Sequence, residues 1–100
     1  MPVTYSVIFT QAARAELIEA QGWYEREAAG VGRHFRQAID ALVERMSGNP
    51  RQFPVVYKNV RRALLRRFPY SLFFVLDKDV LLVIACFHAS RDPSHWQRRA

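Results

Sequence analysis

Hydrophobic residues in the first part of the chain recur with two different periods. A period of two is typical of a strand with one buried face, and it covers Val3, Tyr5, Val7 and Phe9. A helical period follows, with spacings of three and four, and covers Ala13, Leu17, Ala20, Tyr24 and Ala28. Thr10 precedes this stripe and can cap a helix through its hydroxyl group. We therefore expect a strand over Val3–Phe9 and a helix that begins after Thr10.

A second helical stripe lies after the short connection Ala29–Gly32. Its apolar members are Phe35, Ile39, Leu42 and Met46. Gly30 stands where a left-handed helix cap would fall, and Gly48-Asn49-Pro50 ends the second helix. Because the connection is short, the two helices should form an antiparallel hairpin.

The second half contains two runs of residues that favour strands. They are Ser71–Leu76 and Val80–Phe87, with Asp77-Lys78-Asp79 as a tight turn between them. Both runs are continuously apolar, which suggests that both faces of the sheet are at least partly covered. The segment Asn59–Phe68 follows neither period cleanly, so a strand and a short helix both remain possible there. As a strand it would begin a three-stranded antiparallel meander. We expect an α+β fold in which the first strand joins that sheet and the helical hairpin packs on one face.

Composition restricts the class of protein. One hundred residues make one domain, placed at 1–100, and a hydrophobic share of 50% excludes a disordered chain. The longest apolar runs are far shorter than the roughly 20 residues that a membrane span needs. The single cysteine, Cys86, excludes an intramolecular disulfide framework. Because no secretory signal is visible at the N-terminus, we expect a cytoplasmic protein with no membrane partner.

The charge is unevenly distributed. Residues 1–47 hold five arginines against six acids, a net charge of −1. Residues 48–100 hold ten lysines and arginines against three acids, a net charge of +7. Such a field favours polyanions or an acidic protein partner, although a basic surface can also serve solubility alone.

Polar residues crowd the end of the last apolar run. His88 can act as a general acid or base or contact a target, or it can simply satisfy backbone groups at the end of a strand. Pro93 suits the first turn of a terminal helix, and Asp92 can cap that turn or pair with Arg91. Trp96 is more often a hydrophobic anchor for a tail than a stacking platform for a base.

Arginines provide the strongest candidates for binding. Arg98 and Arg99, near the end of the chain, are the freest to touch a polyanion. The densest basic cluster is Arg61, Arg62, Arg66 and Arg67. If its segment is a strand, each face carries two of these arginines, and one pair should be exposed. The pair could grip phosphate or acidic side chains, with a solvated face as the alternative, and we favour binding.

The sequence offers no recognisable metal or cofactor site. The candidate ligands show no ligand spacing on one element, and they are His34, His88, His95 and Cys86. A nucleophile elbow and a glycine-rich phosphate loop are both missing from the sequence. We therefore expect neither a metal ion nor a cofactor.

Four stretches together resemble the RelE/ParE family of bacterial toxins from type II toxin–antitoxin systems. They are the opening TYSVIFTQAARAELIEAQGWY, the helix pair ending in Gly-Asn-Pro, FPYSLFFVLD, and the closing IACFHASRDPSHWQRR. The resemblance implies a compact α+β fold with a curved sheet whose concave side and C-terminal tail are basic. It also implies a cognate acidic antitoxin that holds the toxin inactive, with a heterotetramer or larger complex as a possible assembly.

The family has two kinds of target. One branch cleaves messenger RNA in the ribosome without a metal, and the other inhibits DNA gyrase. This chain departs from the cleaving branch, because Ser71 stands where that branch often has arginine and Trp96 cannot exchange a proton as tyrosine can. We predict a ParE-like growth inhibitor that binds DNA gyrase. A metal-free endonuclease that acts on ribosome-bound messenger RNA through His88, Arg91 and Lys58 is the alternative, and an inactive antitoxin-binding module is a further one.

The resemblance and the charge pattern together give one set of expected contacts. The residues that we expect to touch the target or the antitoxin are Arg61, Arg62, Arg66, Arg67, His88, Arg91, Trp96, Arg98 and Arg99.

Overall fold

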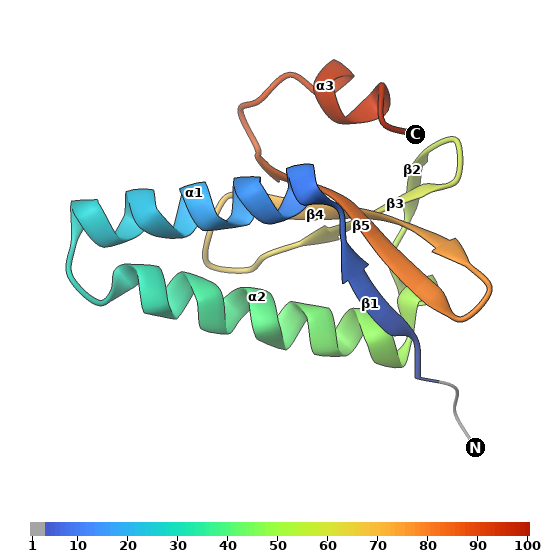
Figure 1. Ribbon diagram of the computed structural model, residues 1–100, viewed down its shortest axis with the longest axis horizontal. Coiled ribbons are helices and arrows are strands. Elements are labelled where there is room, and N and C mark those ends of the chain that lie inside the picture. The colour runs from blue at the N-terminus through green and yellow to red at the C-terminus, as the bar shows by residue number, and fades with distance from the viewer. Residues whose placement is uncertain (1–3) are drawn as a thin grey trace.

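A computed structural model describes residues 4–100 of the protein as a five-stranded sheet with two long helices on one face (Figure 1). The strands are β1 (Ser6–Phe9), β2 (Val55–Tyr57), β3 (Val60–Leu64), β4 (Tyr70–Asp77) and β5 (Val80–His88). The helices are α1 (Gln11–Glu27), α2 (Val31–Gly48), the short 3-10 helix η1 (Pro50–Gln52) and α3 (Ser94–Gln97). No helix among these residues is long and apolar enough to cross a membrane.

The sheet has the strand order β1-β5-β4-β3-β2. β1 runs parallel to β5, from Ser6 opposite Val80 to Phe9 opposite Val83, whereas the other neighbours are antiparallel. The first strand therefore belongs to the same sheet as the strands that follow the helices in the chain, as expected. Its alternation is also confirmed, since Val7 and Phe9 pack on the core while Ile8 is half exposed. The part of the predicted strand at Val3 lies outside the described residues.

The helical hairpin follows the sequence pattern closely. The Thr10 hydroxyl oxygen accepts a hydrogen bond from the Ala13 amide at 3.1 Å, which confirms the predicted cap. The apolar stripe of α1 ends earlier than predicted, because the helix stops at Glu27 and Ala28 is exposed. All four members of the α2 stripe are buried. Gly30 has a φ of 89°, in the left-handed region expected for it.

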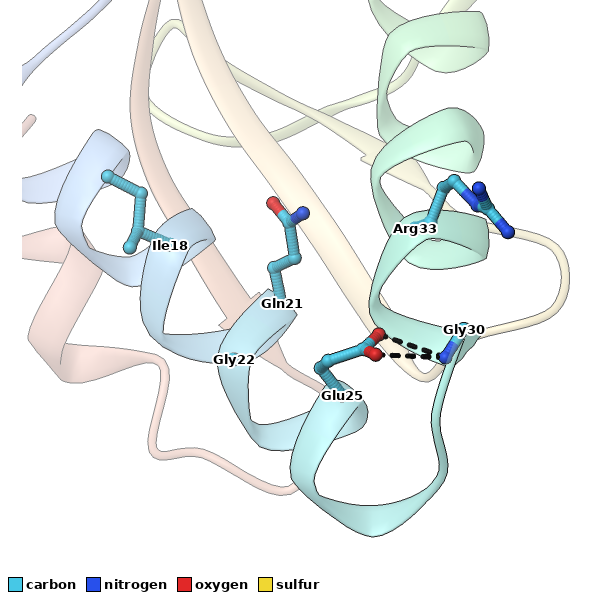
Figure 2. A pocket seen from close by; sticks show the side chains of 6 residues that line it. All are labelled: Ile18, Gln21, Gly22, Glu25, Gly30 and Arg33. Atoms are coloured by element: carbon cyan, nitrogen blue, oxygen red, sulfur yellow. Dashed lines mark hydrogen bonds between the residues drawn. The ribbon is translucent and has the colours of Figure 1, made fainter.

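The Glu25 carboxylate of α1 holds the loop between the two helices and the first turn of α2. Glu25 accepts hydrogen bonds from the amides of Gly30 and Gly32 at 2.9 and 3.0 Å, and Figure 2 shows its side chain reaching across the hairpin to Gly30. A Cβ atom on Gly32 would lie 2.7 Å from the Gln21 carbonyl oxygen. The close approach of the helices at this end therefore depends on a glycine.

The meander differs from the prediction in two places. The segment 59–68 is a strand only as far as Leu64, so the helical interpretation is wrong and Arg66 and Arg67 lie in the connection to β4. A short strand that was not predicted, β2, pairs with β3 and extends the sheet by one strand. The tight turn is confirmed, because Asp77 and Val80 are paired partners on either side of it.

Both faces of the sheet are covered, at least in part. The hairpin packs on one face through a cluster that includes Leu17, Phe35, Leu72, Phe74 and Val83. On the other face, Trp96 packs with Val60, Phe73, Ile84, Ala85 and Phe87. The register of β5 shifts by one residue, since Phe74 pairs with Val83 but Phe73 pairs with Ala85. Ile84 is thus an extra residue, and the bulge turns both Ile84 and Ala85 toward the second face.

Candidate functional site

The C-terminal tail, residues 89–100, is docked onto the sheet by Trp96. The indole stacks on the Phe73 ring with 4.2 Å between centroids and 19° between planes, and Tyr57 meets it edge-on at 5.9 Å. Only 5% of Trp96 remains exposed. Trp96 is therefore an anchor for the tail, and little of its surface is left for a partner.

The turn that leads into α3 is held by Asp92. Its carboxylate accepts a hydrogen bond from the Ser94 amide at 2.9 Å. This bond and one from the Ser94 hydroxyl lower the pKa of Asp92, because both stabilise the ionised form. Asp92 thus caps the turn, as its position before Pro93 suggested. Its pairing with Arg91 is not found, since Arg91 turns to another acid.

That acid is Glu16, on α1. Its carboxylate accepts four hydrogen bonds, one from the Cys86 amide at 3.1 Å, one from Arg91 at 3.1 Å and two from Arg99 at 3.0 and 2.9 Å. Arg99 also donates to the Ile84 carbonyl oxygen at 2.8 Å. Both guanidinium groups lie over the Phe87 ring, Arg91 at 3.9 Å and Arg99 at 5.3 Å from its centroid. We call these contacts the Glu16 clamp.

The clamp holds two of the three arginines of the tail, Arg91 and Arg99. The expectation that Arg99 is free at the chain end is wrong, because the Glu16 carboxylate holds its guanidinium and 27% of its side chain is exposed. Arg91 is also paired but keeps 43% of its side chain exposed. Arg98, which precedes Arg99 in the chain, is exposed. Of the tail arginines, Arg98 and part of Arg91 are therefore open to a partner.

His88 lies beside a cleft of about 410 Å³ between α1 and the end of β5. The cleft is lined by both charged and aromatic side chains, among them Glu19, Trp23, Arg26, Tyr70, His88 and Arg91. His88 pairs with Tyr70 in the sheet, and their rings meet edge-on at 5.2 Å. The structure thus brings His88 and Arg91 together at one end of the sheet.

Burial keeps two groups of this cleft protonated, and a backbone amide orients the ring of His88. The Ser90 amide donates to Nδ1 of His88 at 3.0 Å, so the neutral ring carries its proton on Nε2. Burial raises the pKa of Tyr70, with smaller contributions from Tyr24, Cys86 and Glu19, and it raises the pKa of Cys86 to about 12. Both groups therefore hold their protons at neutral pH. At Nε2, His88 can donate a hydrogen bond to a partner.

Lys58 lies far from this cleft. It occupies the turn between β2 and β3 with a φ of 50°, and its ammonium group is 5.4 Å from the Tyr57 ring. β3 starts next to this turn and ends at Leu64, whose partner Ser71 neighbours the Tyr70–His88 pair. Lys58 and His88 are therefore at opposite ends of the sheet, and the structure does not bring together the three residues predicted for RNA cleavage.

The basic cluster of the sequence is divided by the end of β3. The Arg61 guanidinium donates to the Phe53 carbonyl oxygen at 2.7 Å and so braces the chain before β2. Arg62 is exposed on β3, whereas Arg66 and Arg67 lie beyond it. The expectation of a strand that carries two of the four arginines on each face is therefore wrong, because Arg66 and Arg67 lie outside β3.

Arg66 and Arg67 instead line a groove of about 580 Å³ between α2 and the β3–β4 connection. Its lining combines apolar and basic side chains. We call this surface the basic groove, and its main residues are Ala38, Leu42, Arg45, Leu64, Leu65, Arg66, Arg67 and Phe68. Leu64 is 56% exposed, which is unusual for a leucine beside a core. Arg45 and Leu64 were not predicted, although the pair Leu64-Leu65 next to four arginines was visible in the sequence.

Glu16 was also missed. A single glutamate on an amphipathic helix carries no local sign that it will meet Arg99, 83 positions later in the chain. Among residues 4–100, no three histidine, cysteine or acidic side chains come together in a group that could hold a metal ion.

A sequence profile and two solved structures each match most of the chain. The sequence profile described as the ParE toxin of the type II toxin–antitoxin system parDE matches residues 7–93. Among curated proteins, none matches the chain in sequence. The structure is similar to one titled as the chromosomal ParDE system from P. aeruginosa, with a TM-score of 0.75 and 20% identity over 85% of this chain and 96% of that one. It is also similar to the toxin–antitoxin complex RelBE2 from Mycobacterium tuberculosis, with a TM-score of 0.63 and 20% identity over 88% and 94%.

Proposed function

Because the chain belongs to the ParE toxin family of type II toxin–antitoxin systems, we propose that it arrests growth by binding DNA gyrase and that an acidic antitoxin neutralises it. The fold is shared with both a ParDE and a RelBE2 structure, so fold alone does not separate gyrase from the ribosome as the target. The arrangement of this chain's own residues must therefore be used to distinguish a binding toxin from a nuclease.

The observation that carries the proposal is the separation of the residues that RNA cleavage would need. Metal-free cleavage requires a base for the 2′-hydroxyl, an acid for the leaving oxygen and cations at the phosphate, all within hydrogen-bonding reach of one bond. Lys58 lies at the far end of the sheet from His88. Arg91 is ion-paired with Glu16, which also binds Arg99, and Trp96 is buried and has no acidic proton to exchange at neutral pH. This distribution favours action by contact.

A binding surface is available around the docked tail. Arg98, the exposed part of Arg91 and the Nε2–H group of His88 can donate hydrogen bonds to acidic groups of a target. Since the second half of the chain carries a net charge of +7, it attracts an anionic partner over a distance set by the ionic strength. Binding to gyrase should accordingly weaken as salt increases.

The antitoxin should occupy a different surface, the basic groove. An amphipathic helix or strand with acidic flanks would place apolar side chains on Leu64 and Phe68 and its carboxylates against Arg66 and Arg67. Replacing both Arg66 and Arg67 with glutamate should weaken the complex at least about tenfold, because attraction becomes repulsion. Arg14→Glu, on the exposed face of α1, is the matched control and should change the affinity little. Equal affinities for the two variants would place the antitoxin elsewhere.

One experiment separates the three candidate activities. The parent protein and His88→Gln are assayed for growth arrest, inhibition of gyrase supercoiling and cleavage of ribosome-bound messenger RNA. Glutamine keeps a hydrogen-bonding side chain but cannot shuttle a proton, so a binding toxin should keep most of its gyrase inhibition. A nuclease that uses His88 should lose about 10²–10⁴-fold in rate. A parent that binds the antitoxin but neither inhibits gyrase nor cleaves RNA would be an inactive binding module.

A further inference from the structure

The edge of β5 is only partly covered by β1. β1 ends at Phe9, opposite Val83, and the Thr10 amide makes the last backbone hydrogen bond, to the Val83 carbonyl oxygen at 2.9 Å. The chain then turns into α1, and among residues 4–100 no strand lies beside the remainder of β5 on this side. Buried backbone groups there need other partners, because an unsatisfied amide or carbonyl group is costly in the interior.

Two side chains supply those partners. Glu16 accepts from the Cys86 amide, and Arg99 donates to the Ile84 carbonyl oxygen, while the carboxylate and the guanidinium bind each other through two parallel hydrogen bonds. The pair therefore takes the place of the missing strand at the bulge of β5. One of its members comes from α1 and the other from the end of the tail.

The charge of the Glu16 carboxylate is stabilised by its hydrogen bonds to the Cys86 amide and the two arginines. Its side chain is only 13% exposed, so its charge is largely removed from water and must be balanced by hydrogen bonds and cations. Arg99 cannot leave without exposing the Ile84 carbonyl group and removing two of the four donors to Glu16. The tail is thus held at two points, at Trp96 on the face of the sheet and at Arg99 on its edge.

We propose that Glu16 is a positioning residue for the target-binding surface of this toxin, and the proposal rests on the proposed function. By holding Arg91 and Arg99, which lie on either side of α3, the clamp fixes the helical turn that presents Arg98. Glu16 itself is mostly buried and acts through these arginines. Ordering the tail before binding reduces the entropy that the complex has to overcome.

The test compares variants on both sides of the clamp with matched controls. Glu16→Gln removes the charge and keeps the size, and Glu27→Gln changes an exposed glutamate at the end of the same helix. Arg99→Gln removes the clamped arginine, and Arg98→Gln removes its exposed neighbour. Each purified variant is measured for amide hydrogen exchange over residues 89–97, inhibition of gyrase supercoiling and affinity for the antitoxin.

The proposal predicts how each variant should change tail exchange, gyrase inhibition and antitoxin affinity. Glu16→Gln and Arg99→Gln should each speed exchange in the tail about tenfold or more, since a charge-assisted hydrogen bond is worth at least that factor. Both should weaken gyrase inhibition by a similar factor and leave antitoxin affinity unchanged. Arg98→Gln should weaken inhibition without changing exchange. The double variant Glu16→Gln/Arg99→Gln should be little worse than either single variant, because both lose one interaction.

Two results would overturn the proposal. One is tail exchange at the parental rate in Arg99→Gln, which tests the clamp even if Glu16→Gln fails to fold. The other is a loosened tail in a variant that still inhibits gyrase as well as the parent does. If the parent protein does not inhibit gyrase at all, the proposed function fails, while the exchange measurements still decide whether Glu16 holds the tail.

Discussion

Replacing Trp96 with alanine should reveal how firmly the tail is docked. The indole is 95% covered, stacks on Phe73 at 4.2 Å and contacts a cluster that includes Ile84 and Phe87. Truncating a buried aromatic side chain of this kind costs about 3–5 kcal/mol. Because Trp96 is near the chain end, the tail can undock as a unit, so the loss cannot exceed the free energy with which the tail docks.

The assay is unfolding by urea and by heat, both followed by circular dichroism, with Trp23→Ala as the control. Trp23 is 48% exposed, and its replacement should cost less than about 1 kcal/mol. For a domain of this size each 1 kcal/mol moves the melting temperature by roughly 4–8 °C, so Trp96→Ala should melt at least about 10 °C below the parent. A loss of less than about 1 kcal/mol in Trp96→Ala would refute the docked tail and, with it, the positioning role of the clamp.

The remaining predictions concern a thiol, a glycine and a carboxylate. Burial raises the pKa of Cys86 to about 12, so iodoacetamide at pH 8 should label it only after unfolding, and rapid labelling of the native protein would contradict its burial. Gly32→Ala places a Cβ atom 2.7 Å from a backbone oxygen and should cost about 1–3 kcal/mol, whereas Gly48→Ala meets open space and should not destabilise. Because its folded-state pKa is lowered, Asp92 should stabilise the tail above its ordinary pKa near 3.8 and lose this effect as the pH falls through the folded value. Amide exchange at Ser94 in the parent and in Asp92→Asn checks that sign.

The predicted fold was largely correct because its signals are local. The change from period two to the helical period, the cap at Thr10 and the turn at Asp77-Lys78-Asp79 each involve residues within a few positions of one another. The errors occur where local patterns are weak. Three residues are too few to show a period, so β2 was missed, and the apolar pair Leu64-Leu65 hid the end of β3.

The site was less predictable because it is built from distant segments. The sequence predicted site residues in the tail and at His88, and the structure places His88 and Arg91 at one cleft. It could not reveal that Arg99 turns inward, because that depends on a bulge at Ile84 and on the free edge that β1 leaves. Similarly, Arg45 reaches the basic groove from α2 although it lies about twenty residues before Arg66 in the chain.

The central claim is that this toxin acts on DNA gyrase by binding, and a supercoiling assay with purified gyrase tests it most directly. The parent and a folded His88→Gln variant are titrated against relaxed plasmid at low and high salt, with the antitoxin added in a parallel series. We predict that both proteins inhibit supercoiling, that salt weakens the inhibition and that the antitoxin abolishes it. Uninhibited supercoiling by the parent, together with cleavage of ribosome-bound messenger RNA that His88→Gln cannot perform, would contradict the account.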